Sequence, residues 1–178
     1  MTIAEVDNSR VKSAAFALAA GWERYMNSTD KVESCLSEMR KTAIDVICKS
    51  GYADESVYDS LEKSYINNFI SPEPDYEEIK KTLDALAAIN TDRAVRILLL
   101  FLQGLHQKKC GGIWSRKDEQ VFPWIVESLS LTKFVSKNVW NFLLVICRTE
   151  KYTMNERMQA RDALIRIKSG ILSAKPLA

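Results

Sequence analysis

The sequence contains a single histidine, His106, among its 178 residues. One histidine excludes any metal site or proton relay that needs two imidazoles. Cys110 follows four residues later and could join it as a metal ligand, but structural zinc takes four ligands. The chain also has no Cys-x-x-Cys pair, no Gly-x-Ser-x-Gly elbow and no Gly-Lys-Ser/Thr phosphate loop. These are the usual signals of zinc, serine-hydrolase and nucleotide-binding proteins. We therefore predict a non-enzymatic protein without catalytic residue, metal site or cofactor.

A strong charge imbalance and long apolar runs are absent as well. The chain has 25 basic and 23 acidic residues, a net charge of +2, which gives little attraction for a polyanion. No apolar run reaches the ~20 residues of a membrane span. The scattered cysteines suit small core residues in a reducing compartment, so we expect a cytoplasmic location. An exported form stays open, because Ala17-Leu18-Ala19 faintly resembles the end of a signal peptide. The cysteines are Cys35, Cys48, Cys110 and Cys147.

Helical periodicity is what the sequence does have. Between residues 76 and 89, the apolar residues Ile79, Leu83, Leu86 and Ile89 are spaced by four, three and three, which forms one helical stripe. A second helix follows from about residue 93 to 106 and is apolar on nearly every side. Such a helix has to be covered on more than one face. This pair of helices is the unit that the rest of the chain repeats.

The block Asp84-Ala85-Leu86 recurs as Asp45-Val46-Ile47, Glu127-Ser128-Leu129 and Asp162-Ala163-Leu164, at spacings of 39, 43 and 35 residues. Periods near 40 that contain two helices are typical of HEAT and armadillo solenoids. We predict an all-α, right-handed α-solenoid in one domain, 1–178. Its parts are an N-terminal helix, repeats at about 31–69, 76–107 and 117–148, and a capping half-repeat at 153–169.

Local signals predict the remaining boundaries. Asn8-Ser9 caps the first helix, and Asp30 with Glu33 forms a capping box for the second. The segment 108–115 contains Gly111-Gly112, so we expect a flexible loop outside the repeats. The outer face of the last helix is expected to be charged, as the end of a solenoid must be. The residues of that face are Arg157, Arg161, Arg166 and Lys168.

The segment Asp92-Arg93-Ala94-Val95-Arg96 resembles the Asp-x-x-Val-Arg motif of HEAT repeats. Pro123 is similar to the proline in the first helix of those repeats, and Arg157, Ala160 and Ala163-Leu164 resemble their Arg-x-x-Ala-x-x-Ala-Leu run. The resemblance covers about residues 31–169. It implies an aspartate–arginine ladder between neighbouring repeats, and a scaffold whose second helices bind proteins or, less often, nucleic acid.

The repeat offsets place three stripes level with one another on the second helices, each with i, i+4, i+7 spacing. Together they predict a partly aromatic, partly apolar surface for a helix or an extended peptide. The alternative that Leu100, Trp140 and Leu144 are core residues stays open, as does pairing of the stripes in a homodimer. The predicted partner-binding residues are Tyr58, Glu62, Tyr65, Arg96, Leu100, Gln103, Trp140 and Leu144, with Cys147 ending the third stripe.

A cluster of cations around one tryptophan gives the alternative function. Cations beside an aromatic ring can hold phosphates and stack a base. A nucleic-acid-binding protein similar to the HEAT-like DNA glycosylases is therefore the alternative, although the chain lacks an obvious Trp-Asp pair of the kind those enzymes use. The competing interpretation is a solvated loop whose tryptophan folds onto the core. The cluster comprises Lys108, Lys109, Trp114, Arg116 and Lys117.

Overall fold

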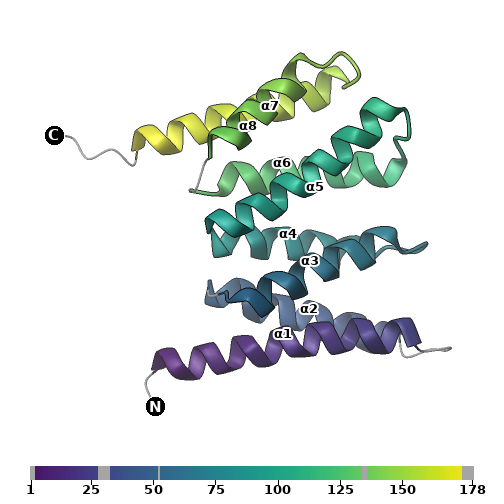
Figure 1. The fold of residues 1–178 in the computed structure, drawn as a ribbon, viewed down its shortest axis with the longest axis vertical. Helices are drawn as coiled ribbons and strands as arrows, with labels where there is room; N and C mark the ends of the chain where they lie inside the picture. Colours follow the sequence, from purple (N-terminus) through teal and green to yellow (C-terminus); the bar gives the residue numbers. More distant parts are fainter. Residues whose placement is uncertain (1–2, 28–32, 52, 134–135, 174–178) are drawn as a thin grey trace. The chain divides into compact units, whose positions relative to one another are not determined.

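The computed structural model describes residues 3–27, 33–51, 53–133 and 136–173 (Figure 1). These residues form eight α-helices and no strand, which confirms the all-α prediction. None of the helices in this described part combines the length and apolar content that a membrane crossing requires. The helices are α1 (Ile3–Asn27), α2 (Glu33–Ser50), α3 (Glu55–Ile70), α4 (Tyr76–Ile89), α5 (Asp92–Gly111), α6 (Arg116–Leu131), α7 (Lys137–Arg148) and α8 (Met154–Ser173).

Side-chain caps set most of the helix starts. Thr91 caps α5 and accepts a hydrogen bond from the Ala94 amide. Ser115 and Asp118 form a reciprocal capping box at the start of α6. Such caps satisfy backbone N–H groups that have no partner within the helix. The predicted capping box of Asp30 and Glu33 lies outside the described residues.

Two predicted boundaries were wrong. Helix α1 begins at Ile3, so Asn8-Ser9 lies within it. Helix α5 continues to Gly111, because Gly112, with φ of 75°, ends it in the left-handed conformation. The segment 108–111 is therefore the last turn of a helix. Pro123 lies inside α6, about two turns after the helix starts at Arg116.

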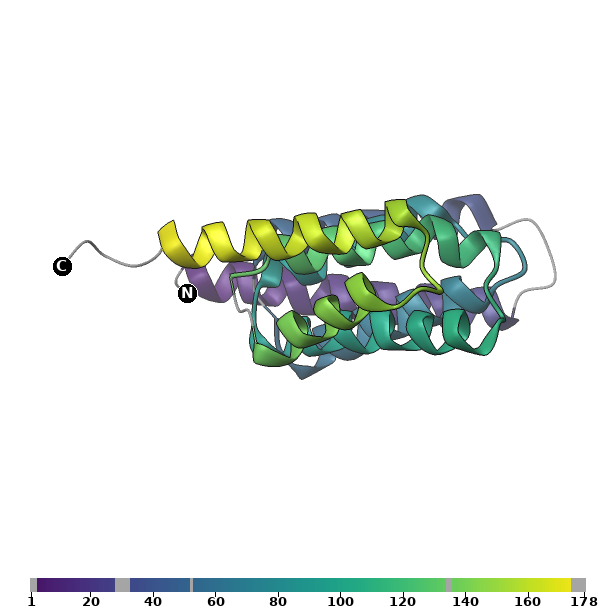
Figure 2. The ribbon, with the colours of Figure 1, turned by 90° about the horizontal axis from the view of Figure 1, so that it is seen from above.

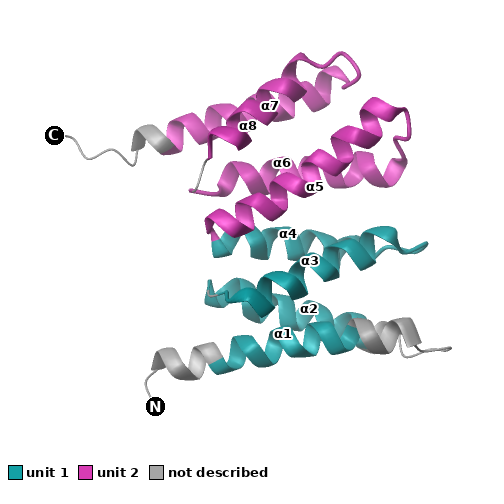
Figure 3. Cartoon of the chain, in the orientation of Figure 1, with its two compact units in different colours: residues 1–89 teal, residues 90–178 magenta. Residues whose placement is uncertain are grey.

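The chain divides into two compact units, Met1–Ile89 and Asn90–Ala178 (Figure 3). In the first unit, α1 packs against α2 and α3, and α4 packs against α2 and α3. Burial of large aliphatic residues from all four helices forms the core of this unit. Among those residues are Leu18, Ile44, Ile47, Leu61, Ile79, Leu83 and Leu86.

In the second unit, α6 packs against α5 and α8, and α7 packs against α8. Viewed from above, α6 and α8 lie in one layer of this unit and α5 and α7 in the other (Figure 2). Leu99 is buried, as its place on the predicted central helix requires. The core of this unit includes Leu98, Leu102, Phe122, Ile125, Leu129, Leu143, Ile146 and Tyr152.

The closely packed hairpins are α1–α2, α3–α4, α5–α6 and α7–α8. The predicted repeats at 31–69, 76–107 and 117–148 instead paired α2 with α3, α4 with α5 and α6 with α7. The repeated acid-x-aliphatic block lies in α2, α4, α6 and α8, which is the second helix of each hairpin. Helix α8 is thus the second half of a complete hairpin.

Candidate functional site

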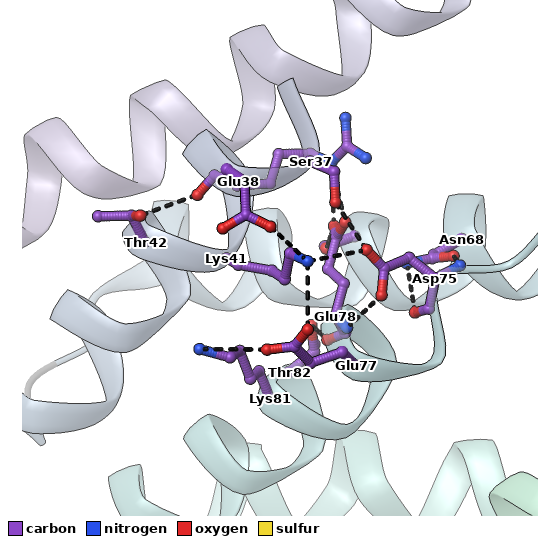
Figure 4. A network of polar contacts seen from close by, with 12 residues as sticks. Ser37, Glu38, Lys41, Thr42, Asn68, Asp75, Glu77, Glu78, Lys81 and Thr82 are labelled. Atoms are coloured by element: carbon purple, nitrogen blue, oxygen red, sulfur yellow. Dashed lines mark hydrogen bonds and ion pairs between the residues drawn. The ribbon is translucent and has the colours of Figure 1, made fainter. Parts of the chain in front are cut away.

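The most extensive polar cluster lies in the first unit and joins α2, α3 and α4 (Figure 4). Arg40 Nε donates to both carboxylate oxygens of Glu78, at 3.1 and 3.0 Å, and Ser64 Oγ donates to Glu78 Oε1 at 2.9 Å. Arg40 and Glu78 are buried, and burial raises the pKa of Glu78. The Arg40 and Glu78 side chains are only 4% and 0% exposed, so the pair offers almost no surface to a substrate and instead joins the three helices.

Around this pair, largely half-buried ion pairs connect α2 to α4 and to Asp75, the residue before α4. Lys81 Nζ lies 2.7 Å from Asp45 Oδ2, and Lys41 Nζ contacts Asp75 and Glu77 at 3.3 and 3.2 Å. The hydrogen bond that Lys81 donates to the Asp45 carboxylate is the main cause that raises the pKa of Lys81. These pairs link residues about 36 positions apart, close to the repeat spacing.

The aspartate–arginine motif behaves differently from the ladder that the HEAT resemblance implies. Arg96 Nη2 lies 2.6 Å from Asp92 Oδ2, four residues earlier in the same helix, and both side chains are exposed. The two charges therefore pair within α5. The contacts that join α2 to α4 use lysines and Arg40 instead.

The predicted basic cluster forms contacts within the fold. Lys108 Nζ lies 3.0 Å from Asp118 Oδ1 and Lys109 Nζ lies 3.0 Å from Glu156 Oε1. Both lysines belong to the last turn of α5, where cations also complement the helix dipole. The carboxylates lie at the starts of α6 and α8. Although burial acts to raise it, hydrogen bonds from Ser115 and Lys108 lower the pKa of Asp118.

Trp114 folds onto the core of the second unit. Its ring makes edge contacts with Phe122 and Tyr152, with centroids 6.1 and 6.3 Å apart. Lys109 Nζ lies 4.3 Å from the centre of the indole, in cation–π geometry. The tryptophan is thus packed against a lysine and two aromatic rings of its own chain, as the competing interpretation of the loop had it. Arg116 is exposed and Lys117 is half-buried.

His106 belongs to the same aromatic cluster. Its Nδ1 lies 3.0 Å from the Tyr152 hydroxyl and its Nε2 lies 3.5 Å from Cys110 Sγ. Burial lowers the pKa of His106 and raises that of Tyr152. A thiol beside an imidazole resembles the cysteine–histidine pair of nucleophilic enzymes. Here, however, Nδ1 of His106 contacts a phenol, and burial lowers the pKa of the imidazole, which makes it a weaker base. In the part of the chain that the structure describes, no three histidine, cysteine or acidic residues are placed to hold a metal.

The three predicted binding stripes differ in exposure. On α3, Tyr58 and Tyr65 are buried and Glu62 is half-buried, so this helix does not present its tyrosines to solvent. On α5, Arg96 is exposed, Leu100 is 57% exposed and Gln103 is half-buried. On α7 the stripe is half-buried throughout. The residues of the α7 stripe are Trp140, Leu144 and Cys147.

An apolar groove of about 290 Å³ lies between α7 and α8, within the second unit. Its volume is at the low end for small-molecule sites, and Met154 and Met158 on its rim are 65% and 49% exposed. Leu144 and Cys147 enter it from the predicted stripe. We refer to it as the α7–α8 groove. Its lining residues are Leu144, Cys147, Met154, Arg157, Met158, Arg161 and Leu164.

The charged lining of the α7–α8 groove is entirely cationic. Arg157 and Arg161 line it, and no acidic residue does. Burial is the main cause that raises the pKa of Cys147, while the charges of Arg161 and Arg148 act in the opposite direction. A second, smaller groove lies between α6 and α8. In contrast to the α7–α8 groove, its lining includes the acidic residues Glu127 and Asp162.

The outer face of α8 carries the expected charges, but it also has apolar residues. Met154, Met158 and Ile165 are exposed alongside the arginines. The sequence interpretation missed these residues, because the charges were taken as the surface of a cap. The sequence does contain a pattern that indicates this mixed face. Met154 and Met158 are spaced i, i+4, and so are Arg157 and Arg161.

Comparison of the chain with protein-family models, with curated proteins and with solved structures gives no significant match. The likeness to HEAT repeats therefore rests on the residues and the repeat spacing of this sequence. Any functional conclusion rests on the geometry of the site.

Proposed function

We propose that this chain is a short array of HEAT-like helical hairpins that acts as a non-catalytic protein-binding module. The block that recurs in α2, α4, α6 and α8 supports the repeat, as does the packing of each of these helices against the helix before it. The solenoid and its binding function are proposed together, since stacked helical repeats commonly present a surface for partners.

The observation that carries the proposal is the α7–α8 groove. It combines an apolar floor with two exposed methionines, and methionine side chains adapt to the shape of a partner. Apolar surface beside a groove marks interaction sites on soluble proteins. Leu144 belongs both to the lining of this groove and to the predicted stripe on α7.

The nucleic-acid alternative has less support. Lys108 and Lys109 already pair with carboxylates, and Trp114 packs against Phe122 and Tyr152. A phosphate would have to compete with these carboxylates, and a base would have to displace packed rings. We therefore retain protein binding as the proposal.

The experiment is affinity capture with quantitative mass spectrometry, in cells that naturally contain the protein. The Met154→Ser, Met158→Ser double variant changes two exposed groove residues. Leu131→Ser is the matched control, because Leu131 is 61% exposed and does not line the groove. The proposal expects at least one captured protein to be lost with the double variant and kept with the control. Identical captured sets for all three proteins would contradict it.

A further inference from the structure

We infer that the partner of the α7–α8 groove is an amphipathic helix with carboxylates beside its apolar stripe. The inference rests on the proposed function and adds the chemistry of the partner. A helix in a groove presents side chains at i, i+3, i+4 and i+7. The required pattern is thus a short apolar stripe with acidic residues one turn apart along its edge.

The apolar part of the pattern follows from the exposed and buried residues. Leu164 is buried at the floor, whereas Met154 and Met158 stand on the rim one helical turn apart. The spacing of the two methionines matches the spacing of successive contacts along a docked helix. The groove has room for a few apolar side chains, so the contact is local and does not enclose a whole ligand.

The charged part follows from the two arginines on the same face of α8. Arg157 and Arg161 are also one turn apart, which gives a cationic edge parallel to the methionines. Arg157 Nε is buried and has no hydrogen-bond acceptor among the described residues. Arginine binds carboxylates through two parallel hydrogen bonds, and a partner's carboxylate would supply the acceptor after a small shift of the side chain.

The same charges argue against a second copy of this chain in the groove. A symmetric dimer brings the same surface patch of both copies together. Because the charged lining residues are both arginines, such a dimer would place like charges face to face at the apolar contact. An acidic partner removes this repulsion and satisfies the arginines.

Three synthetic helical peptides of identical apolar sequence provide the test. They carry leucines at i, i+3 and i+7, with glutamate, glutamine or lysine at the flanking positions. Fluorescence anisotropy at ~50 mM salt measures their binding to the full-length protein. We expect the glutamate peptide to bind about tenfold more tightly than the lysine peptide, since two ion pairs on a partly exposed surface contribute modestly.

Two variants make the result specific to the groove. Arg157→Glu with Arg161→Glu should reverse the preference for the glutamate peptide, so that the lysine peptide binds more tightly than the glutamate peptide. Arg116→Glu with Lys133→Glu makes the same change in net charge at exposed positions away from the groove and should leave the preference intact. Circular dichroism verifies that both double variants remain helical.

Other outcomes overturn the inference in distinguishable ways. If all three peptides bind equally and Met158→Ser weakens each of them, the groove binds apolar helices and only the acidic partner is wrong. If no peptide binds and sedimentation shows a dimer that Met158→Ser dissociates, a second copy occupies the groove. If no peptide binds to a monomeric protein, the inference fails, and identical captured sets in the affinity experiment would show that the proposed function fails with it.

Discussion

Lys109 of α5 and Glu156 of α8 form an ion pair of 3.0 Å although 47 residues separate them in the sequence. The neighbouring Lys108 makes the equivalent contact with Asp118 of α6. Two adjacent lysines at the end of one helix thus bind the first turns of two others. Glu156 also accepts a hydrogen bond from the Thr153 amide, so one carboxylate completes a helix cap and joins two helices.

The Lys109–Glu156 pair should stabilise the second unit. Both side chains are nearly buried, at 9% and 11% exposure, so Lys109→Met leaves a carboxylate with little water to solvate it. We expect the free energy of unfolding to fall by about 2–4 kcal/mol, measured by urea denaturation. The matched control is Arg96→Met, which breaks an exposed pair in the same helix and should cost less than ~1 kcal/mol. Equal effects of the two variants would mean that the Lys109 pair is as solvated as the surface pair.

The Arg40–Glu78 pair should have the larger effect in the first unit. Arg40→Met leaves the Glu78 carboxyl group buried without its guanidinium partner, and we expect the free energy of unfolding to fall by about 3–5 kcal/mol. Lys80→Met removes the exposed i, i+4 pair with Asp84 on α4 and should cost only a few tenths of a kcal/mol, roughly 0.3–0.5. Thermal unfolding followed by circular dichroism gives both values. A loss below ~1 kcal/mol for Arg40→Met would refute the assigned role of the pair.

The environment of His106 predicts a dependence of stability on pH. Burial lowers the pKa of His106, so the unfolded chain binds its proton at a higher pH than the folded chain does. As the pH falls below the ordinary histidine value of ~6.5, the unfolded state is favoured and stability decreases. Urea denaturation between pH 5 and 7 measures the slope, roughly the window in which histidine titrates.

In His106→Gln, the dependence of the free energy of unfolding on pH that histidine causes should disappear. Any dependence that carboxylates cause at lower pH should remain. Because this is the only histidine, the variant removes every imidazole from the protein. An unchanged slope in His106→Gln would show that burial does not shift the titration of His106 as inferred.

Binding of nucleic acid can be tested without breaking the ion pairs of Lys108 and Lys109. Replacing all four cations of the basic cluster would break the pairs of Lys108 and Lys109, so the informative variant is Arg116→Ala with Lys117→Ala. We expect the wild type to show no binding of labelled single- or double-stranded oligonucleotides at ~50 mM salt. Micromolar binding by the wild type that weakens steeply with salt and is lost in the variant would favour the nucleic-acid alternative.

The local structure was largely readable from the sequence. The stripe of Ile79, Leu83, Leu86 and Ile89 predicted a helix over residues 76–89, and α4 has those bounds. Periodicity and caps act within a few residues, so they leave a clear local signal. The end of α5 was predicted at about residue 106, because the two glycines indicated a flexible loop over residues 108–115. Only Gly112 adopts a positive φ, and the helix continues up to Gly111.

The pairing of the helices was not readable from the same signals. A repeat of about 40 residues gives the spacing of like helices, but it does not say whether α2 packs against the helix before it or the helix after it. The exposed face of α8 was mispredicted for a similar reason. Its arginines suggested a solvated cap, and only the position of α7 shows that Met154 and Met158 border a groove.

The most direct test of the account is methyl NMR of the protein labelled with ¹³C at its methionine methyl groups. Met154 and Met158 border the α7–α8 groove, whereas Met39 lies on α2 in the first unit and serves as an internal control. We predict that the glutamate peptide shifts the Met154 and Met158 signals in a saturable manner and leaves the Met39 signal unchanged. Uniform small shifts, or a saturable shift of Met39 alone, would contradict the assignment of the groove as the binding surface.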